Sequence, residues 1–135
     1  MLVGLLVAVA ITLSEASIQK VSINGSTICG DRYISGVTVQ LWEEDTFDPD
    51  DLLEEGITAK TNGTFSVSGV TEETTLIEPY ALFIHNCDVK NAEKCVRSTR
   101  FPIDRKYING PVYEMSLVQL KTRQGEDKET CREKK

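Results

Sequence analysis

The chain has 135 residues, of which 21 are acidic and 15 are basic, so its formal net charge is −6 when the single histidine is neutral. This length suffices for one compact domain and is too short for two. A net negative charge provides no general attraction to nucleic acid, which argues against a nucleic-acid-binding protein.

The N-terminal segment predicts export from the cell. Residues 2–13 are apolar except for Gly4 and Thr12, and the segment Ser14-Glu15-Ala16 follows them. Small residues at 14 and 16 occupy the positions that a signal peptidase inspects. The run is shorter than the ~20 residues of a membrane-spanning helix, so we expect no transmembrane span. We therefore predict a signal peptide at 1–16, cleavage after Ala16, and a secreted, extracellular domain at 17–135.

The rest of the chain has the alternating pattern of β-strands. Val37, Val39 and Leu41 alternate with more polar residues, which is typical of a half-buried strand. Asn62-Gly63 predicts a hairpin turn, because both residues tolerate positive φ, and residues 109–111 predict another turn. The predicted strands are 18–29, 35–43, 55–61, 64–70, 80–85, 96–103 and 112–121. Seven or eight short strands in one domain predict an all-β Greek-key β-sandwich.

The segment between the second and third predicted strands is acidic. We predict one short helical turn there, capped by Asp48 and running from Pro49 to Leu53. No basic residue offsets its eight carboxylates, which are Glu43, Glu44, Asp45, Asp48, Asp50, Asp51, Glu54 and Glu55. Calcium binds such oxygens, but the spacing differs from an EF-hand and no glycine forces the required turn. We therefore interpret the segment as a solvated acidic loop and expect no metal or cofactor.

Four cysteines in an exported domain predict two disulfides, for which three pairings exist. Cys87 and Cys95 are close enough in sequence to close one loop, which leaves Cys29 for Cys131. The second bridge would hold the polar tail, residues 123–135, along the first strand. A metal site is the competing interpretation, but neither a CxxC motif nor paired histidines accompany the cysteines.

Two kinds of surface site are predicted. The sequons Asn24-Gly25-Ser26 and Asn62-Gly63-Thr64 are candidate glycosylation sites, and Asn62 lies at the predicted turn. Four basic residues around the predicted Cys87–Cys95 loop could meet anionic lipid head groups or an acidic partner. They are Lys90, Lys94, Arg97 and Arg100. The alternative is that these charges only keep an edge strand soluble.

Several segments resemble the nematode transthyretin-like family of secreted proteins. The motifs that carry the resemblance are residues 36–45, 48–53 and 61–65, Pro79-Tyr80, His85-Asn86-Cys87, Phe101-Pro102-Ile103 and Tyr107-Ile108. The resemblance spans essentially the whole domain after the leader. It implies a prealbumin-like β-sandwich, secretion, and a role in extracellular binding at cell surfaces.

The leading functional hypothesis is a binding or adaptor protein and not an enzyme. The transthyretin-fold hydrolase of 5-hydroxyisourate uses several histidines, an arginine and a C-terminal Tyr-Arg-Gly-Ser. Here His85 is the only histidine and the given sequence ends Arg132-Glu133-Lys134-Lys135. We interpret His85 as structural. A carrier of small hydrophobic ligands in a transthyretin-like oligomer is the alternative, and the sequence leaves the partner and oligomeric state open.

Overall fold

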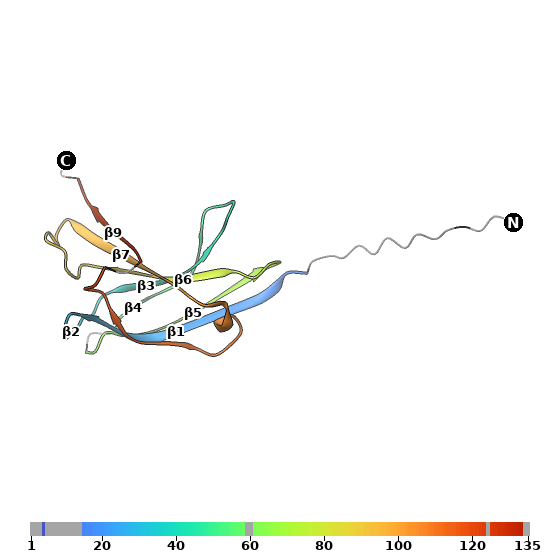
Figure 1. The fold of residues 1–135 in the computed structure, drawn as a ribbon, viewed down its shortest axis with the longest axis horizontal. Coiled ribbons are helices and arrows are strands. Elements are labelled where there is room, and N and C mark those ends of the chain that lie inside the picture. The colour runs from blue at the N-terminus through green and yellow to red at the C-terminus, as the bar shows by residue number, and fades with distance from the viewer. Residues whose placement is uncertain (1–3, 5–14, 59–60, 124, 134–135) are drawn as a thin grey trace.

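The computed structural model describes residue 4 and residues 15–58, 61–123 and 125–133 (Figure 1). All of the predicted signal peptide except Gly4, Glu15 and Ala16 lies outside the described residues. Within the described part of the chain, no helix has the length and apolar character needed to cross a membrane.

The described residues form strands and a single 3₁₀ turn, η1. The elements are β1 (Ser17–Cys29), β2 (Arg32–Tyr33), β3 (Thr38–Glu44), β4 (Asp51–Ile57), β5 (Thr64–Glu73), β6 (Glu78–His85), β7 (Cys95–Pro102), η1 (Arg105–Tyr107), β8 (Tyr113–Gln119) and β9 (Glu126–Cys131). The strands form two sheets that pack face to face (Figure 1). In one, β1 pairs antiparallel with β2 and β5 and parallel with β8; the other has the order β4-β3-β6-β7-β9. The predicted all-β sandwich is confirmed.

The core lies between the sheets because alternate residues of facing strands are apolar. Val39 and Leu41 of β3 are fully buried, and Val67 of β5 is almost so. Phe83 of β6 stands at the centre, with its ring edge-to-face against Phe65 and Phe101 at centroid distances of 5.4 Å each. Such aromatic contacts add to the burial of apolar area. The two-residue period therefore fixes which face of each strand points inward.

The predicted hairpin at Asn62-Gly63 is wrong. A turn does occur there, with Gly63 at φ 61°, but β4 pairs with β3 and β5 pairs with β1, so the turn connects the two sheets. The Gly63 carbonyl accepts a hydrogen bond from the Thr27 N–H at 2.9 Å. A Cβ at position 63 would lie 2.7 Å from the Thr27 carbonyl oxygen, so close backbone approach as well as positive φ requires glycine.

The predicted helical turn at 49–53 is also wrong. Strand β4 begins at Asp51, and its backbone pairs with β3 from Asp51 to Ile57. Leu53 packs against the core, so pairing and burial outweigh the local helix-start signal. The single 3₁₀ turn of the described residues is η1, where the Asp104 carboxylate accepts a hydrogen bond from the Lys106 N–H at 2.8 Å.

The disulfide pairing also differs from the prediction. Cys29 bonds to Cys87 and Cys95 bonds to Cys131. The first bridge joins Cys29 at the end of β1 to Cys87, which lies two residues after the end of β6. This bridge therefore links the two sheets. Cys95 and Cys131 are direct partners in the β7–β9 ladder, with Cα atoms 4.0 Å apart. The tail therefore lies along β7 as β9, not along β1.

We expect peptide mapping of the unreduced protein to recover Cys29 linked to Cys87 and Cys95 linked to Cys131. Replacing both Cys29 and Cys87 by Ser should lower the free energy of unfolding by about 4 kcal/mol, because this bridge joins residues 58 apart in the chain. Urea unfolding of both proteins measures this difference. A peptide containing Cys87 linked to Cys95 would contradict the observed pairing.

Candidate functional site

Arg97 is buried inside the sandwich and is not available to a partner. Its side chain has no exposed surface and pairs with the Asp127 carboxylate at 2.6 Å. Its Nη1 also donates to the carbonyl oxygens of Cys87 and Leu120 at 2.6 and 2.8 Å. The prediction that Arg97 binds an anionic partner is therefore wrong. The two-residue period of the strand indicates this burial, because Arg97 lies two residues after the buried Cys95 and two before the buried Thr99.

His85 extends the network around Arg97. Its Nδ1 accepts from the Cys87 N–H at 3.1 Å, which leaves the proton on Nε2 to be donated to Thr99 Oγ1 at 2.8 Å. The Thr99 hydroxyl in turn donates to Asp127 at 2.8 Å. Burial, followed by the charge of Arg97, lowers the pKa of His85 to about 4. His85 is thus a neutral, fully hydrogen-bonded structural residue in the folded protein, which fits its interpretation from the sequence.

Arg100 is compensated within the protein. Its guanidinium lies 3.6 Å from the centre of the Tyr80 ring and pairs with Glu44 at 3.0 Å and Glu126 at 3.5 Å. Two of the four basic residues predicted to act together, Arg97 and Arg100, are therefore paired with acidic side chains of the protein itself. Lys90 and Lys94 are exposed, and no ion pair is found for them among the described residues.

The two lysines lie on a loop, residues 88–94, that is cross-linked at both of its ends. Cys87 before it is bonded to β1, and Cys95 after it is bonded to β9. Within the loop, the Asn91 carbonyl accepts from the N–H groups of Lys94 and Cys95 at 3.1 and 2.8 Å. Arg132 donates to the carbonyls of Glu93 and Lys94. We call this segment the cross-linked loop.

The two sequons lie in different environments. Asn62 is exposed at the turn between the sheets, and its side chain accepts a hydrogen bond from the Thr64 N–H at 3.3 Å. Asn24 is half-buried in the middle of β1, where Ser66 of β5 and Glu114 of β8 are its partners on either side. Glycosylation at Asn24 and Asn62 stays a prediction, and Asn62 is the more accessible acceptor.

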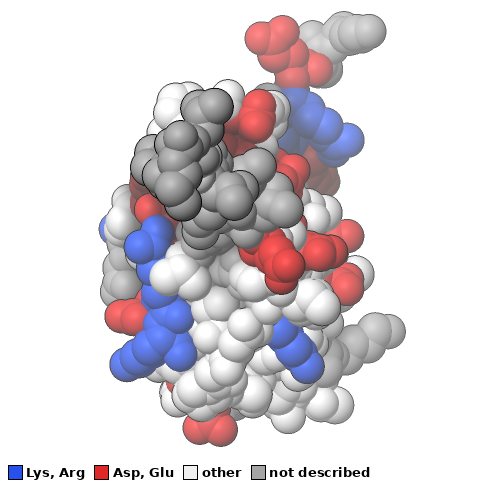
Figure 2. Space-filling model, turned by 90° about the vertical axis from the view of Figure 1, so that its right-hand side faces the viewer, with Lys and Arg blue, Asp and Glu red and all other residues white. Residues whose placement is uncertain are grey.

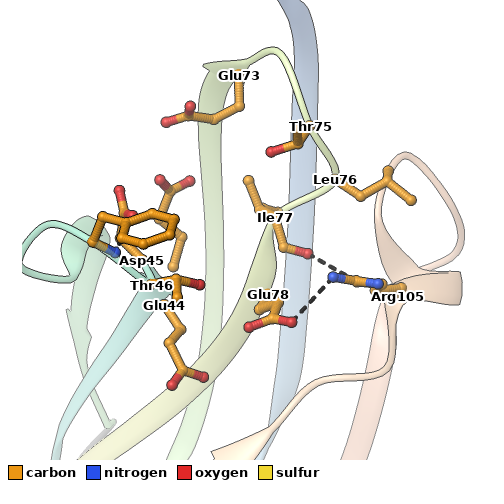
Figure 3. A pocket seen from close by; sticks show the side chains of 11 residues that line it. Glu44, Asp45, Thr46, Glu73, Thr75, Leu76, Ile77, Glu78 and Arg105 are labelled. Carbon is orange, nitrogen blue, oxygen red and sulfur yellow. Dashed lines mark hydrogen bonds and ion pairs between the residues drawn. The ribbon is translucent and has the colours of Figure 1, made fainter.

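A second candidate site is an acidic hollow of about 460 Å³ at the end of the sandwich where β1 begins (Figure 3). Glu43, the residue after Trp42 on β3, follows the inward row of Val39 and Leu41 and is only 3% exposed. The interpretation of the whole acidic segment as solvated is therefore wrong at Glu43. Glu73 ends the inward row of β5 and faces it from the other sheet. We define the acidic hollow by Glu43, Asp45 and Glu73. Asp51 lies beside it, with a carboxylate oxygen within 4.8 Å of those of Glu43 and Asp45.

In the part of the chain that the structure describes, no basic side chain forms an ion pair with Glu43. Burial, and then the Glu73 carboxyl beside it, raises the pKa of Glu43 to about 7. Among the described residues, Glu43 Oε2 is buried without a hydrogen-bond partner. Arg105 also borders the hollow, but it points to Glu78 at 3.2 Å and to the Ile77 carbonyl (Figure 3). On the face shown in Figure 2, acidic and basic side chains form separate small clusters among uncharged residues.

These features define a class of protein: a single β-sandwich domain with two disulfides and polar sites in loops at its two ends. The transthyretin-like family model matches residues 24–104. Transthyretin-like protein 16 of Caenorhabditis elegans is 38% identical over 133 residues, which are 97% of each chain. Transthyretin-like protein 46 of the same organism is 36% identical over 110 residues, covering 77% of this chain and 61% of its own. The chain belongs to the transthyretin-like family, as the resemblance implied.

Neither relative is named for an enzymatic activity. Among solved structures, a 9R-lipoxygenase from Cyanothece PCC8801 aligns with 76% of this chain and 17% of its own, at 13% identity and a TM-score of 0.49. These values are too low to establish a shared fold.

We expect Arg97→Met to lower the free energy of unfolding by about 3–5 kcal/mol, because it leaves the Asp127 carboxylate buried without its partner. Arg105→Met is the matched control, since the Arg105–Glu78 pair is half exposed on both sides and should contribute at most about 1 kcal/mol. Urea unfolding of both variants measures the two effects. Similar losses in the two would contradict the structural role of Arg97.

His85 should make stability fall with acidity. Because its pKa is about 4 in the folded protein and about 6.5 when unfolded, the unfolded chain takes up the proton first as the pH falls. The stabilisation is complete above about pH 6.5 and lost towards pH 4, so roughly 2 kcal/mol should disappear between pH 7 and pH 5. Urea unfolding at both pH values should show this loss in the parent and a smaller loss in His85→Gln. Equal losses would rule out His85 as the source.

Proposed function

We propose that this chain is a secreted extracellular binding protein that uses the cross-linked loop to contact anionic lipid head groups at a cell surface. The observation that carries the proposal is the anchoring of this loop by a different disulfide at each end. A loop held in one conformation loses little conformational entropy when it binds, so more of the contact energy appears as affinity.

The two exposed lysines of this loop support an anionic partner. Lys90 and Lys94 carry positive charge close to a rigid backbone, and the ammonium groups are free to reach outward. Each lysine near an anionic membrane surface contributes about 1 kcal/mol of attraction, which decreases as salt screens it. Contact of this kind requires no catalytic group, and His85, the one histidine of the chain, is committed to its hydrogen bonds.

The proposal predicts binding of the oxidised protein to vesicles of phosphatidylcholine that contain an anionic phospholipid, and weaker binding to phosphatidylcholine alone. Replacing both Lys90 and Lys94 by Glu should weaken binding by roughly thirtyfold or more, as the loss of about 1 kcal/mol per lysine implies. Vesicle co-sedimentation at low and high salt measures both effects.

The matched control replaces Lys20 and Lys106 by Glu, which changes the net charge equally at the opposite end of β1. This variant should bind the anionic vesicles several-fold more tightly than the loop variant. Equal weakening in the two variants would show that only net charge matters. Binding that ignores the anionic lipid would overturn the lipid contact.

A further inference from the structure

We propose a calcium site at the edge of the acidic hollow, in which Glu43 and Asp45 of the hollow and the adjacent Asp51 supply carboxylate oxygens to one Ca²⁺ ion. The inference concerns the opposite end of the sandwich from the cross-linked loop and does not depend on the function proposed for that loop.

The fold brings the three carboxylates together from two segments, the end of β3 and the start of β4. Glu43 and Asp51 are direct partners in the β3–β4 ladder, and Asp45 lies just beyond the end of β3. Carboxylate oxygens from all three lie within 4.8 Å of one another. Ligands on opposite sides of a Ca²⁺ ion, each at 2.3–2.6 Å, are about 5 Å apart, so a single ion can contact all three.

The position of the acidic loop is held by contacts outside the proposed ligand atoms. Asp50 accepts a hydrogen bond from the Asp45 N–H at 3.2 Å with one carboxylate oxygen and from the Tyr80 hydroxyl at 2.6 Å with the other. Tyr80 lies on β6, in the middle of the second sheet. The segment that presents Asp45 is therefore fixed to the sheet, which lowers the entropy lost when an ion binds.

The second, independent observation is the buried oxygen of Glu43. A cluster of exposed acids needs no ligand, because water solvates each carboxylate. Glu43 is different: it is 97% buried, lines the hollow, and its Oε2 has no hydrogen-bond partner among the described residues. A buried acceptor left unpaired costs about 1–3 kcal/mol, and more when it is charged. A bound cation would satisfy this oxygen.

Among the residues described around Glu43, none offers it a paired positive charge. Glu73 faces it and hydrogen-bonds to it only while one of the two carboxyls keeps a proton, because two ionised carboxylates carry no donor. Arg105 is held by Glu78 and the Ile77 carbonyl. The remaining ways to neutralise Glu43 are a proton shared with Glu73 or a metal ion. Oxygen ligands without nitrogen or sulfur suit a hard cation, and the irregular arrangement of strand and loop suits Ca²⁺ better than the octahedral Mg²⁺.

The test is isothermal titration of the metal-free, oxidised protein with CaCl₂ at neutral to mildly alkaline pH. We expect one site with a dissociation constant of about 0.1–1 mM, the range of extracellular calcium modules. Glu43→Gln and Asp51→Asn should each weaken it about tenfold or more. Glu72→Gln is the matched control, because Glu72 is the exposed neighbour of Glu73 on the outward row of β5, and it should leave the affinity unchanged.

Asp51 is exposed, so Asp51→Asn should remain folded and provides the test even if Glu43→Gln does not fold, which circular dichroism would reveal. Absence of calcium-dependent heat up to about 10 mM CaCl₂ would overturn the site. So would binding that Asp51→Asn and Glu72→Gln weaken equally. Titration with MgCl₂ completes the test, since affinity for Mg²⁺ equal to that for Ca²⁺ would contradict the choice of ion.

Discussion

The burial of the Arg97 guanidinium is the constraint on which much of this structure depends. A permanently charged group without solvent must be surrounded by acceptors, because its desolvation costs several kcal/mol. Those acceptors come from separate segments: Asp127 on β9, and the carbonyls of Cys87 and Leu120. The same side chain therefore explains why a highly charged C-terminal segment forms a strand. Asp127 must stay ionised beside it, and although burial opposes this, hydrogen bonds from Arg97 and Thr99 hold the pKa of Asp127 below its usual value.

The network also explains why the conspicuous polar residues of this domain are engaged in structural hydrogen bonds. Both ring nitrogens of His85 are engaged, one by the Cys87 N–H and the other by Thr99, so the imidazole presents no free nitrogen to a substrate. Cys87 is at once the acceptor for Arg97, the donor to His85 and the partner of Cys29. The cross-linked loop starts from this residue and thus from the most heavily constrained point of the second sheet. Rigidity at that point is what the proposed lipid contact requires, because a fixed loop loses little conformational entropy on binding.

The sequence allowed most of the strands and their inward faces to be predicted, because the two-residue period records burial directly, but it did not predict β2 or β9. It did not reveal which strands are neighbours. Asn62-Gly63 makes a turn in either case, whether its flanking strands pair or cross between sheets, and the choice depends on contacts with Thr27 far along the chain. Cysteine spacing failed for the same reason: Cys95 and Cys131 are partners in a ladder that no local pattern shows. The charges of Arg97 and Glu43 predict surface positions, but both residues continue an inward row and are buried.

Arg97 and Glu43 pose the same physical problem at two places in the sandwich. Each is an ionisable side chain on an inward row, where an apolar residue of similar size would usually be as stable or more so. For Arg97, the protein itself provides the opposite charge and the remaining acceptors. For Glu43, the neighbours are further carboxylates, which make the ionised form less favourable instead of more. The protein's own residues balance the charge of Arg97, whereas Glu43 needs either a proton shared with Glu73 or a cation from solution. A cation fits both the sign of the missing charge and the oxygen atoms that surround its place.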